Sequence, residues 1–229
     1  IKEVTMQALA TLAEKRDNET GNHLIRTRRY IEVLMRGLSA QPEFAAQLDP
    51  LTQELIAKAA PLHDIGKVGI PDAILLKPGR LTADEFVIMQ GHAQIGADAL
   101  TEAIERVLSS HPDNEHEQDN RYALSFLEIA REIAGGHHEK WDGSGYPQGL
   151  AGNAIPLSAR LMALADVFDA LVCKRHYKEA FSIEKSIDII RQGRGQHFDP
   201  SIVDVFLANI DACVTIAERH ADHHPEAST

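Results

Sequence analysis

The pair His63-Asp64 stands at the end of an apolar run with helical spacing, and it constrains the fold more than any other feature of the sequence. Neutral imidazole and carboxylate together suit divalent transition metals. Neighbouring residues on a helix point about 100° apart, so one metal takes both side chains poorly unless the helix ends there. A carboxylate can bridge two metals through its two oxygens, which favours a site with more than one metal. The alternative is a capped helix end with a solvated histidine.

Further side chains of metal-binding type lie at or near the ends of other apolar segments, or within one. The pair His137-His138 follows an amphipathic stretch, and Asp166 lies inside a segment that is apolar nearly all round. A buried carboxylate is costly unless it is paired or bound to a metal. Helices that each aim ligands inward form a shared site in a helical bundle. The candidate ligands are Glu19, His23, His63, Asp64, His92, His137, His138 and Asp166.

The ligand types indicate the chemistry. Oxygen and imidazole without thiolate suit iron, manganese, zinc, nickel or cobalt, and a cysteine-type structural zinc is disfavoured. Two divalent metals a few ångströms apart can generate a bridging hydroxide near neutral pH and bind phosphoryl oxygens as Lewis acids. Lys67 could then stabilise the charge that develops as a pentacoordinate phosphorus forms. The alternative for Lys67 is a solvated lysine at a helix C-terminus.

Apolar residues recur at helical spacing along most of the chain, and no segment shows the alternation of a strand. We therefore expect an all-α fold, a single-domain helical bundle. The polar stretch 110–120 is expected to be a solvent loop, and residues 139–157 a structured loop rich in glycine and proline. A capping box at residues 82–85 is expected to start a helix that reaches His92, and a separate helix is expected to follow it as far as residue 109. One last helix is expected to run from Pro200 through Ile210 and Cys213. The other expected helices cover residues 2–16, 20–38, 51–62, 123–133, 158–172 and 182–191.

The expected domain organisation has three parts. Residues 1–16 form an N-terminal helix that continues an upstream regulatory domain, residues 17–218 form the catalytic domain, and residues 219–229 form a polar C-terminal tail that is frayed from His220 on. The chain begins at Ile1 rather than Met, so we expect it to be part of a longer protein. The first helix could also support a homodimer.

Charge and cysteine content narrow the partners. The formal net charge of −11 argues against a basic surface for nucleic acid, so no DNA partner is expected. Bound metals could still reverse the sign locally and attract a small anion. The two cysteines lack metal spacing and predict no disulfide framework, which fits a reducing cytoplasm. We recognise no signal peptide and no apolar run long enough for a membrane span.

Two longer motifs carry a family resemblance. The segment HDIGK occupies residues 63–67, and HHEKWDGSGYP occupies residues 137–147. Shorter matches are DVFDAL at 166–171 and FDP at 198–200. With these motifs, the chain resembles the HD-GYP family of the HD phosphohydrolase superfamily from about Glu14 to Phe206. The resemblance implies a helical bundle of the HD phosphohydrolase type.

The resemblance also implies an activity, because family members hydrolyse the bacterial messenger cyclic di-GMP. We expect a metal-dependent phosphodiesterase of second-messenger and two-component signalling that yields linear pGpG and, after further hydrolysis, GMP. Two or three divalent ions are implied, iron or manganese before nickel, cobalt or zinc. Glu19 and His23 match positions that help hold a third metal. The core ligands implied by the resemblance are His63, Asp64, His92, His137, His138 and Asp166.

Substrate contacts are implied in the same way. Lys67 matches a phosphate-binding lysine, and with Asp64 it forms the expected catalytic pair. The loop with Gly145, Tyr146 and Pro147 is implied to shape the pocket and to contact partner signalling domains. The plain alternative for this loop is a rigid turn with glycines at positive φ and a packed tyrosine. Residues that match a segment gripping the substrate are Arg175, Tyr177 and Lys178.

One departure from the family bears on the substrate. His176 stands where the family has proline, which puts substrate affinity rather than metal binding in question. The implied partners are a cyclic dinucleotide and an upstream receiver or sensory domain. Two other interpretations remain, namely a hydrolase of another cyclic nucleotide and a sensor that binds cyclic di-GMP with little turnover. The complete ligand set and Tyr146 favour the enzyme.

Overall fold

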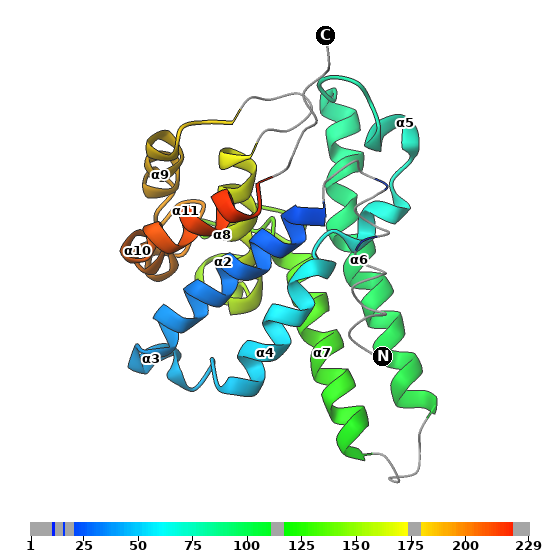
Figure 1. Ribbon diagram of the computed structural model, residues 1–229. Coiled ribbons are helices and arrows are strands. Elements are labelled where there is room, and N and C mark those ends of the chain that lie inside the picture. Colours follow the sequence, from blue (N-terminus) through cyan, green and yellow to red (C-terminus); the bar gives the residue numbers. More distant parts are fainter. Residues whose placement is uncertain (1–10, 12–15, 17–20, 111–116, 174–179, 222–229) are drawn as a thin grey trace.

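Two helices, α2 (Gly21–Ser39) and α8 (Leu157–Val172), pack against each other near the centre of the fold (Figure 1). The computed structural model describes residues 11, 16, 21–110, 117–173 and 180–221. Across these ranges the secondary structure is helical without a β-strand, and the prediction of an all-α fold is confirmed. The predicted helix 2–16 lies outside the described residues except for residues 11 and 16.

The core forms between α2 and α8 because both helices bury large apolar side chains. Leu34 of α2 and Phe168 of α8 are fully buried, and burying one such side chain contributes about 1.5–3 kcal/mol. The apolar character of α8 all round predicted its burial, and this prediction is confirmed. The helix begins at Leu157, one residue earlier than predicted, because Pro156 leads into its first turn.

The helix before the His-Asp pair ends at the pair, as the sequence predicts. Asp49 is the N-cap of α4 (Pro50–Ala59), and its carboxylate accepts hydrogen bonds from the backbone N–H groups of Leu51 and Thr52. It gives way to the 3₁₀ helix η1 (Ala60–Leu62), then to His63 and Asp64, and then to the 3₁₀ helix η2 (Ile65–Gly69). The two side chains are therefore released from α-helical spacing. The short helices α3 (Pro42–Ala45) and α5 (Asp72–Leu75) flank this segment.

Helices α6 (Ala83–Ser110) and α7 (Glu117–Gly136) form a long pair on one side of the fold (Figure 1). The predicted capping box at the start of α6 is confirmed, since Thr82 N–H donates to Glu85 Oε2 at 2.7 Å and Glu85 N–H donates to Thr82 Oγ1 at 3.3 Å. The predicted break after His92 is wrong, because α6 continues without interruption and contains no proline. The predicted loop 110–120 is also wrong at its end, where residues 117–120 belong to α7.

The C-terminal helices cover the other side of α2 and α8. The predicted N-caps of α9 and α10 are confirmed: Ser182 accepts from the backbone of Lys185, and Asp199 accepts from the backbone of Ser201. The prediction of one last helix is wrong, because the chain bends by 73° at Asn209. These helices are α9 (Ile183–Gln192), α10 (Pro200–Ala208) and α11 (Ile210–Arg219), and the 3₁₀ helix η4 (Gly152–Ala154) precedes α8.

The first residues of the predicted C-terminal tail are held by α2 rather than frayed. The carbonyl of His220 accepts a hydrogen bond from Arg26 Nη1 at 2.7 Å, and the carbonyl of Ala221 accepts one from Asn22 Nδ2 at 3.4 Å. Residues 222–229 lie outside the described residues. Among the described helices, none alone has the length and apolar character of a membrane span; α10 and α11 meet these criteria only when joined across their bend.

Gly66 of η2 packs under α6 with no room for a side chain. A Cβ there would overlap the carbonyl oxygen of His92 and lie 2.5 Å from the backbone nitrogen of Gly96. We expect Gly66→Ala to lower the free energy of unfolding by about 2–3 kcal/mol, because backbone must shift. The measurement is urea unfolding, with the midpoint shifted at constant m.

The matched control is Gly91→Ala, also a glycine-to-alanine change but at a helical position where the new Cβ meets no atom within 4 Å beyond its chain neighbours and the backbone of its own helix. This substitution should raise the free energy of unfolding by about 0.5–1 kcal/mol, because it removes a flexible residue from a helix. Equal effects of the two substitutions would contradict the tight contact between η2 and α6.

Candidate metal centre

Seven side chains of metal-binding type form two neighbouring groups where α2, α6, α7 and α8 meet the His63-Asp64 turn. Within each group the ligand-type atoms lie within 4.8 Å of one another. All seven belong to the set predicted from the sequence, and the remaining candidate, Glu19, lies outside the described residues. The first group is Asp64, His92, His137 and His138, and the second group is His23, His63 and Asp166.

The Asp64 carboxylate lies between the two groups. Its Oδ1 is 3.2 Å from His92 Nε2 and 3.6 Å from His137 Nε2, which belong to the first group. Its Oδ2 is 3.2 Å from His63 Nε2 in the second group and 2.7 Å from Lys67 Nζ. Each oxygen therefore faces a different group, which is the arrangement that a bridging carboxylate requires.

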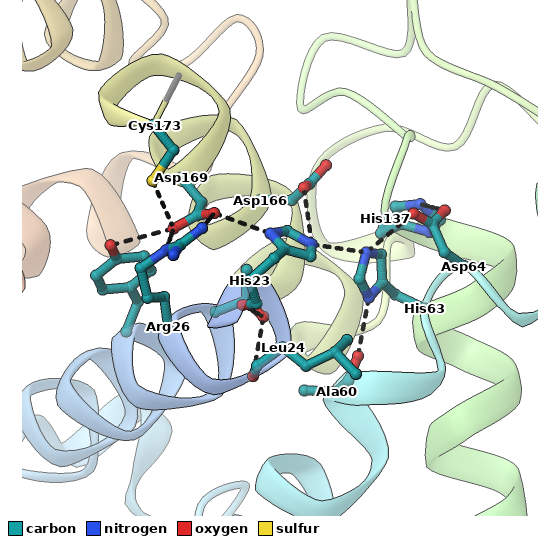
Figure 2. A network of polar contacts seen from close by, with 12 residues as sticks. His23, Leu24, Arg26, Ala60, His63, Asp64, His137, Asp166, Asp169 and Cys173 are labelled. Atoms are coloured by element: carbon teal, nitrogen blue, oxygen red, sulfur yellow. Dashed lines mark hydrogen bonds and ion pairs between the residues drawn. The ribbon is translucent and has the colours of Figure 1, made fainter. Parts of the chain in front are cut away.

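The second group continues this row away from Asp64. His63 Nε2 lies 3.5 Å from His23 Nε2, which lies 3.7 Å from Asp166 Oδ1. Figure 2 shows Asp166, His23, His63 and Asp64 in this order, with His137 beside Asp64. The sequence predicted Asp166 to be buried, but its side chain is 21% exposed, so it lies at the rim of the centre.

Hydrogen bonds at Nδ1 fix the orientation of four histidines. A carbonyl or an ionised carboxylate oxygen only accepts, so Nδ1 carries a proton, and in the neutral imidazole, the form that binds metal, Nε2 keeps a lone pair that faces the groups. Such partners of ligating histidines are typical of metal sites. The bonds run from His63 to the carbonyl of Ala60 at 3.1 Å, from His92 to that of Met89 at 2.7 Å, from His137 to that of Ile133 at 3.0 Å, and from His23 to Asp169 Oδ2 at 2.9 Å.

The lone pairs face other acceptors. The Nε2 atoms of His92 and His137 are buried and make no hydrogen bond with any described residue, although both lie near Asp64 Oδ1. Nε2 of His23 and Nε2 of His63 lie 3.5 Å apart, so either one donates to the other or both accept a cation. Buried polar atoms normally have a partner, and acceptors that face one another attract only a cation between them. The donor set therefore fits divalent metal ions in both groups.

Burial and charge set the protonation states of this centre. Burial lowers the pKa of His137 and of His138, so both imidazoles are neutral at neutral pH, the form that binds metal. Burial alone would raise the pKa of Asp64, but Lys67 and His63 outweigh it and hold that pKa well below its usual range. Burial alone would lower the pKa of His63, yet the adjacent Asp64 carboxylate raises it.

Asp169 of α8 supports the second group from behind, and sequence reasoning gave it no role. It is 2% exposed and accepts hydrogen bonds from Arg26 Nε at 2.7 Å, Arg26 Nη2 at 2.9 Å and the Tyr30 hydroxyl at 3.2 Å. Figure 2 shows Arg26 and His23 both directed at the Asp169 carboxylate. Burial opposes its charge, but His23 and Arg26 lower its pKa to about 2. One sequence feature could have indicated this role: Asp169 lies three residues after Asp166, which places both carboxylates on one face of α8.

The predicted loop residues lie beside the first group. The Tyr146 ring stacks on the His138 ring, and Gly145 packs against the backbone of residues 138–140, while Pro147 follows. Gly143 has φ of 83°, as the rigid-turn interpretation predicts, but Gly145 does not have a positive φ. The predicted substrate residues Arg175, Tyr177 and Lys178, and His176 among them, lie outside the described residues.

The sequence model of the HD domain family matches residues 7–202, and the chain belongs to this family. A protein of Vibrio cholerae named "Probable cyclic di-GMP phosphodiesterase" is 52% identical over 97% of the chain. The "3'3'-cGAMP-specific phosphodiesterase 2" of Vibrio cholerae is 41% identical over 91% of the chain. The chain spans 47% and 35% of these two curated relatives, less than half of their length.

A solved structure confirms the fold. The HDG"Y"P protein from Bdellovibrio bacteriovorus superposes with a TM-score of 0.53 at 18% identity, over 84% of this chain and 54% of that chain. At this identity the likeness shows the fold alone. Together with the HD domain match, it confirms the predicted helical bundle of the HD type and the predicted resemblance to HD-GYP proteins.

We expect Asp169→Asn to lower the free energy of unfolding by about 3–5 kcal/mol, because Arg26 would keep a buried charge without its carboxylate. Arg26 is 1% exposed, so water cannot replace the lost partner. Asp204→Asn is the matched control, since it removes one carboxylate from the exposed Arg194–Asp204 pair. Its effect should stay within about 1 kcal/mol. Chemical denaturation of both variants measures the difference, and a small effect at Asp169 would contradict the supporting role.

Proposed function

We propose that this chain is a metal-dependent phosphodiesterase that hydrolyses cyclic di-GMP, with either linear pGpG or GMP as the final product. The observation that carries the proposal is the Asp64 carboxylate, whose two oxygens face two groups of imidazole and carboxylate ligands. The name of the relative that is 52% identical supports cyclic di-GMP as the substrate. A pair of metal sites joined by one carboxylate is suited to phosphoryl chemistry.

Divalent cations in the two groups, when bound, would supply an activated water as nucleophile and Lewis-acid stabilisation of phosphoryl oxygens. Asp64 is assigned the bridging position between the groups. The Nδ1 hydrogen bonds of His63, His92 and His137 orient their Nε2 atoms before any ion arrives, which lowers the cost of ordering the ligands. Iron or manganese is our first choice, since both accept mixed imidazole and carboxylate ligands.

Lys67 is assigned to the substrate phosphate rather than to the metals. Its side chain is 14% exposed and its Nζ lies 2.7 Å from Asp64 Oδ2, so the ammonium stands at the edge of the space that both groups enclose. A phosphodiester oxygen directed to this edge would gain a charged donor as negative charge develops on phosphorus. Arg175, Tyr177 and Lys178 complete the proposed substrate contacts from the resemblance alone.

A third metal held by Glu19 and His23 stays a prediction. His23 donates Nδ1 to Asp169 and offers only Nε2, which faces His63 and Asp166. This geometry supports His23 as a ligand of the second group. A third ion would need the Glu19 carboxylate together with the exposed side of Asp166, which has two oxygens to share.

A second substrate deserves a direct comparison. The relative named as specific for 3'3'-cGAMP is 41% identical, which supports a mixed purine cyclic dinucleotide as the alternative. A sensor with little turnover is the other alternative. Hydrolysis of both cyclic dinucleotides by the metal-loaded protein, followed by chromatographic separation of products, distinguishes these cases. Preferential cleavage of 3'3'-cGAMP would overturn cyclic di-GMP as the proposed substrate. Binding without cleavage would overturn the proposed enzymatic activity.

The regulatory setting also stays a prediction. It comprises an upstream receiver or sensory domain, a homodimer, partner signalling domains at the loop with Tyr146, and a cytoplasmic location. The length of the curated relatives, of which the chain spans less than half, is compatible with such an arrangement.

We expect Asp64→Ala to lose metal and activity together, because both groups share this carboxylate. Metal analysis of anaerobically purified protein should show at least one divalent ion fewer per chain than in the wild type. Conversion of cyclic di-GMP should fall to background in the same sample. Full turnover with unchanged metal content would contradict the bridging role of Asp64.

We expect Lys67→Ala to keep near wild-type metal content and to lower kcat/KM by roughly 10²–10³, the scale for losing one donor to the transition state. Lys58→Ala is the control, because Lys58 pairs with Glu54 in α4 and belongs to neither group. It should leave kcat/KM unchanged. Unaltered kinetics in Lys67→Ala would support the alternative of a solvated lysine at the end of a helix.

A further inference from the structure

His138 differs from the other histidines of the two groups. The other four have Nδ1 fixed by a carbonyl or a carboxylate oxygen, whereas no hydrogen bond within the described residues holds either ring nitrogen of His138. Instead, its ring stacks on the ring of Tyr146, with centroids 4.7 Å apart and an interplanar angle of 24°. The orientation of this ligand therefore depends on a flat aromatic contact.

Hydrogen bonds hold the loop that carries Tyr146 against the residues that follow α7. Tyr146 N–H donates to the carbonyl of His138 at 3.2 Å. The buried Glu139 carboxylate accepts the backbone N–H groups of Gln148 at 2.7 Å and of Leu150 at 3.0 Å. A Cβ at Gly145 would lie 2.6 Å from the Cα of Glu139. These contacts hold the tyrosine ring in place over His138.

Besides Tyr146, the His138 ring contacts the rings of two other histidines of the first group, His92 and His137. Its ring lies 5.0 Å from that of His92 in an edge-on contact and 4.0 Å from that of His137 in a tilted one. Without Tyr146, rotation of the His138 ring about its side-chain bonds would meet no restraint from the loop. Ordering a free side chain on binding costs affinity.

We propose that Tyr146 is the positioning residue of the first metal group, where it holds the His138 ring by stacking. The inference rests on the proposed function, because it assumes that His138 binds metal. The contact that Tyr146 makes with the His138 ring is made by its own ring rather than by its hydroxyl. The role is comparable to that of the Nδ1 partners, whose loss typically weakens metal binding by roughly 10–100-fold.

The test measures Co²⁺ binding to the metal-free chain by visible absorption and chelator competition. Tyr146→Leu should weaken one of two binding steps by roughly 10–100-fold and leave the other unchanged. Tyr146→Phe should bind Co²⁺ as the wild type does, because it keeps the ring. Ser144→Ala is the loop control, since its hydroxyl bonds only within the exposed turn to Asp142 and should not alter either step.

A double-mutant cycle separates positioning from a general effect on folding. His138→Ala should weaken the same step, and in that background Tyr146→Leu should have no further effect. An additive loss in the double variant, wild-type affinity in Tyr146→Leu, or a loss in Tyr146→Phe would each overturn the proposal. If the wild-type protein took up no Co²⁺, the metal centre of the proposed function itself would be overturned. The measurement therefore distinguishes failure of the proposed function from failure of the role of Tyr146.

Discussion

Unprotonated imidazole nitrogens and carboxylate oxygens that face one another inside a bundle repel, and positive charge between them offsets this repulsion. The geometry around Asp64 shows this constraint, because His63, His92 and His137 all direct Nε2 toward its carboxylate. The backbone carbonyls that hold Nδ1 come from the same helix segments as the histidines, so local structure alone aims the lone pairs. The Lys67 ammonium offsets part of this repulsion at Asp64 Oδ2, and divalent ions bound by the two groups would offset the rest.

A second buried charge ties this centre to the rest of the fold. Asp169 accepts from Arg26 and His23 of α2 and is thereby the polar link between the two central helices. Arg26 also donates to the carbonyl of His220, so the end of α11 belongs to the same network. A pair this deeply buried is weak evidence for stability in itself, since desolvation opposes it. Its consequence is orientation, because the imidazole of His23 has one tautomer and one direction.

Most of the site could be predicted because its chemistry lies where apolar runs end, at His63-Asp64 and His137-His138. Asp169 could not, because it and Asp166 occupy the same apolar helix, and only the arrival of Arg26 from another helix decides which carboxylate is buried. The predicted break in α6 after His92 had no such cause, because the helix contains no proline and its continuity could have been predicted from the sequence. What the sequence does not show is the tertiary contact of this helix, where the backbone of Gly96 lies against Gly66 of η2.

The charge of the centre supports the proposed function, in which an acidic chain would receive a phosphodiester. The chain carries a formal net charge of −11, which would repel a dinucleotide from most of its surface. Only Asp64 and Asp166 supply ligand carboxylates among the described residues, so two divalent ions would leave the centre positive even before Lys67 is counted. Imidazoles allow this result, because they bind metal without neutralising it. A site built from histidines requires that each ring be held in place. The loop with Tyr146 meets that requirement for His138, whose ring nitrogens have no hydrogen-bond partner among the described residues.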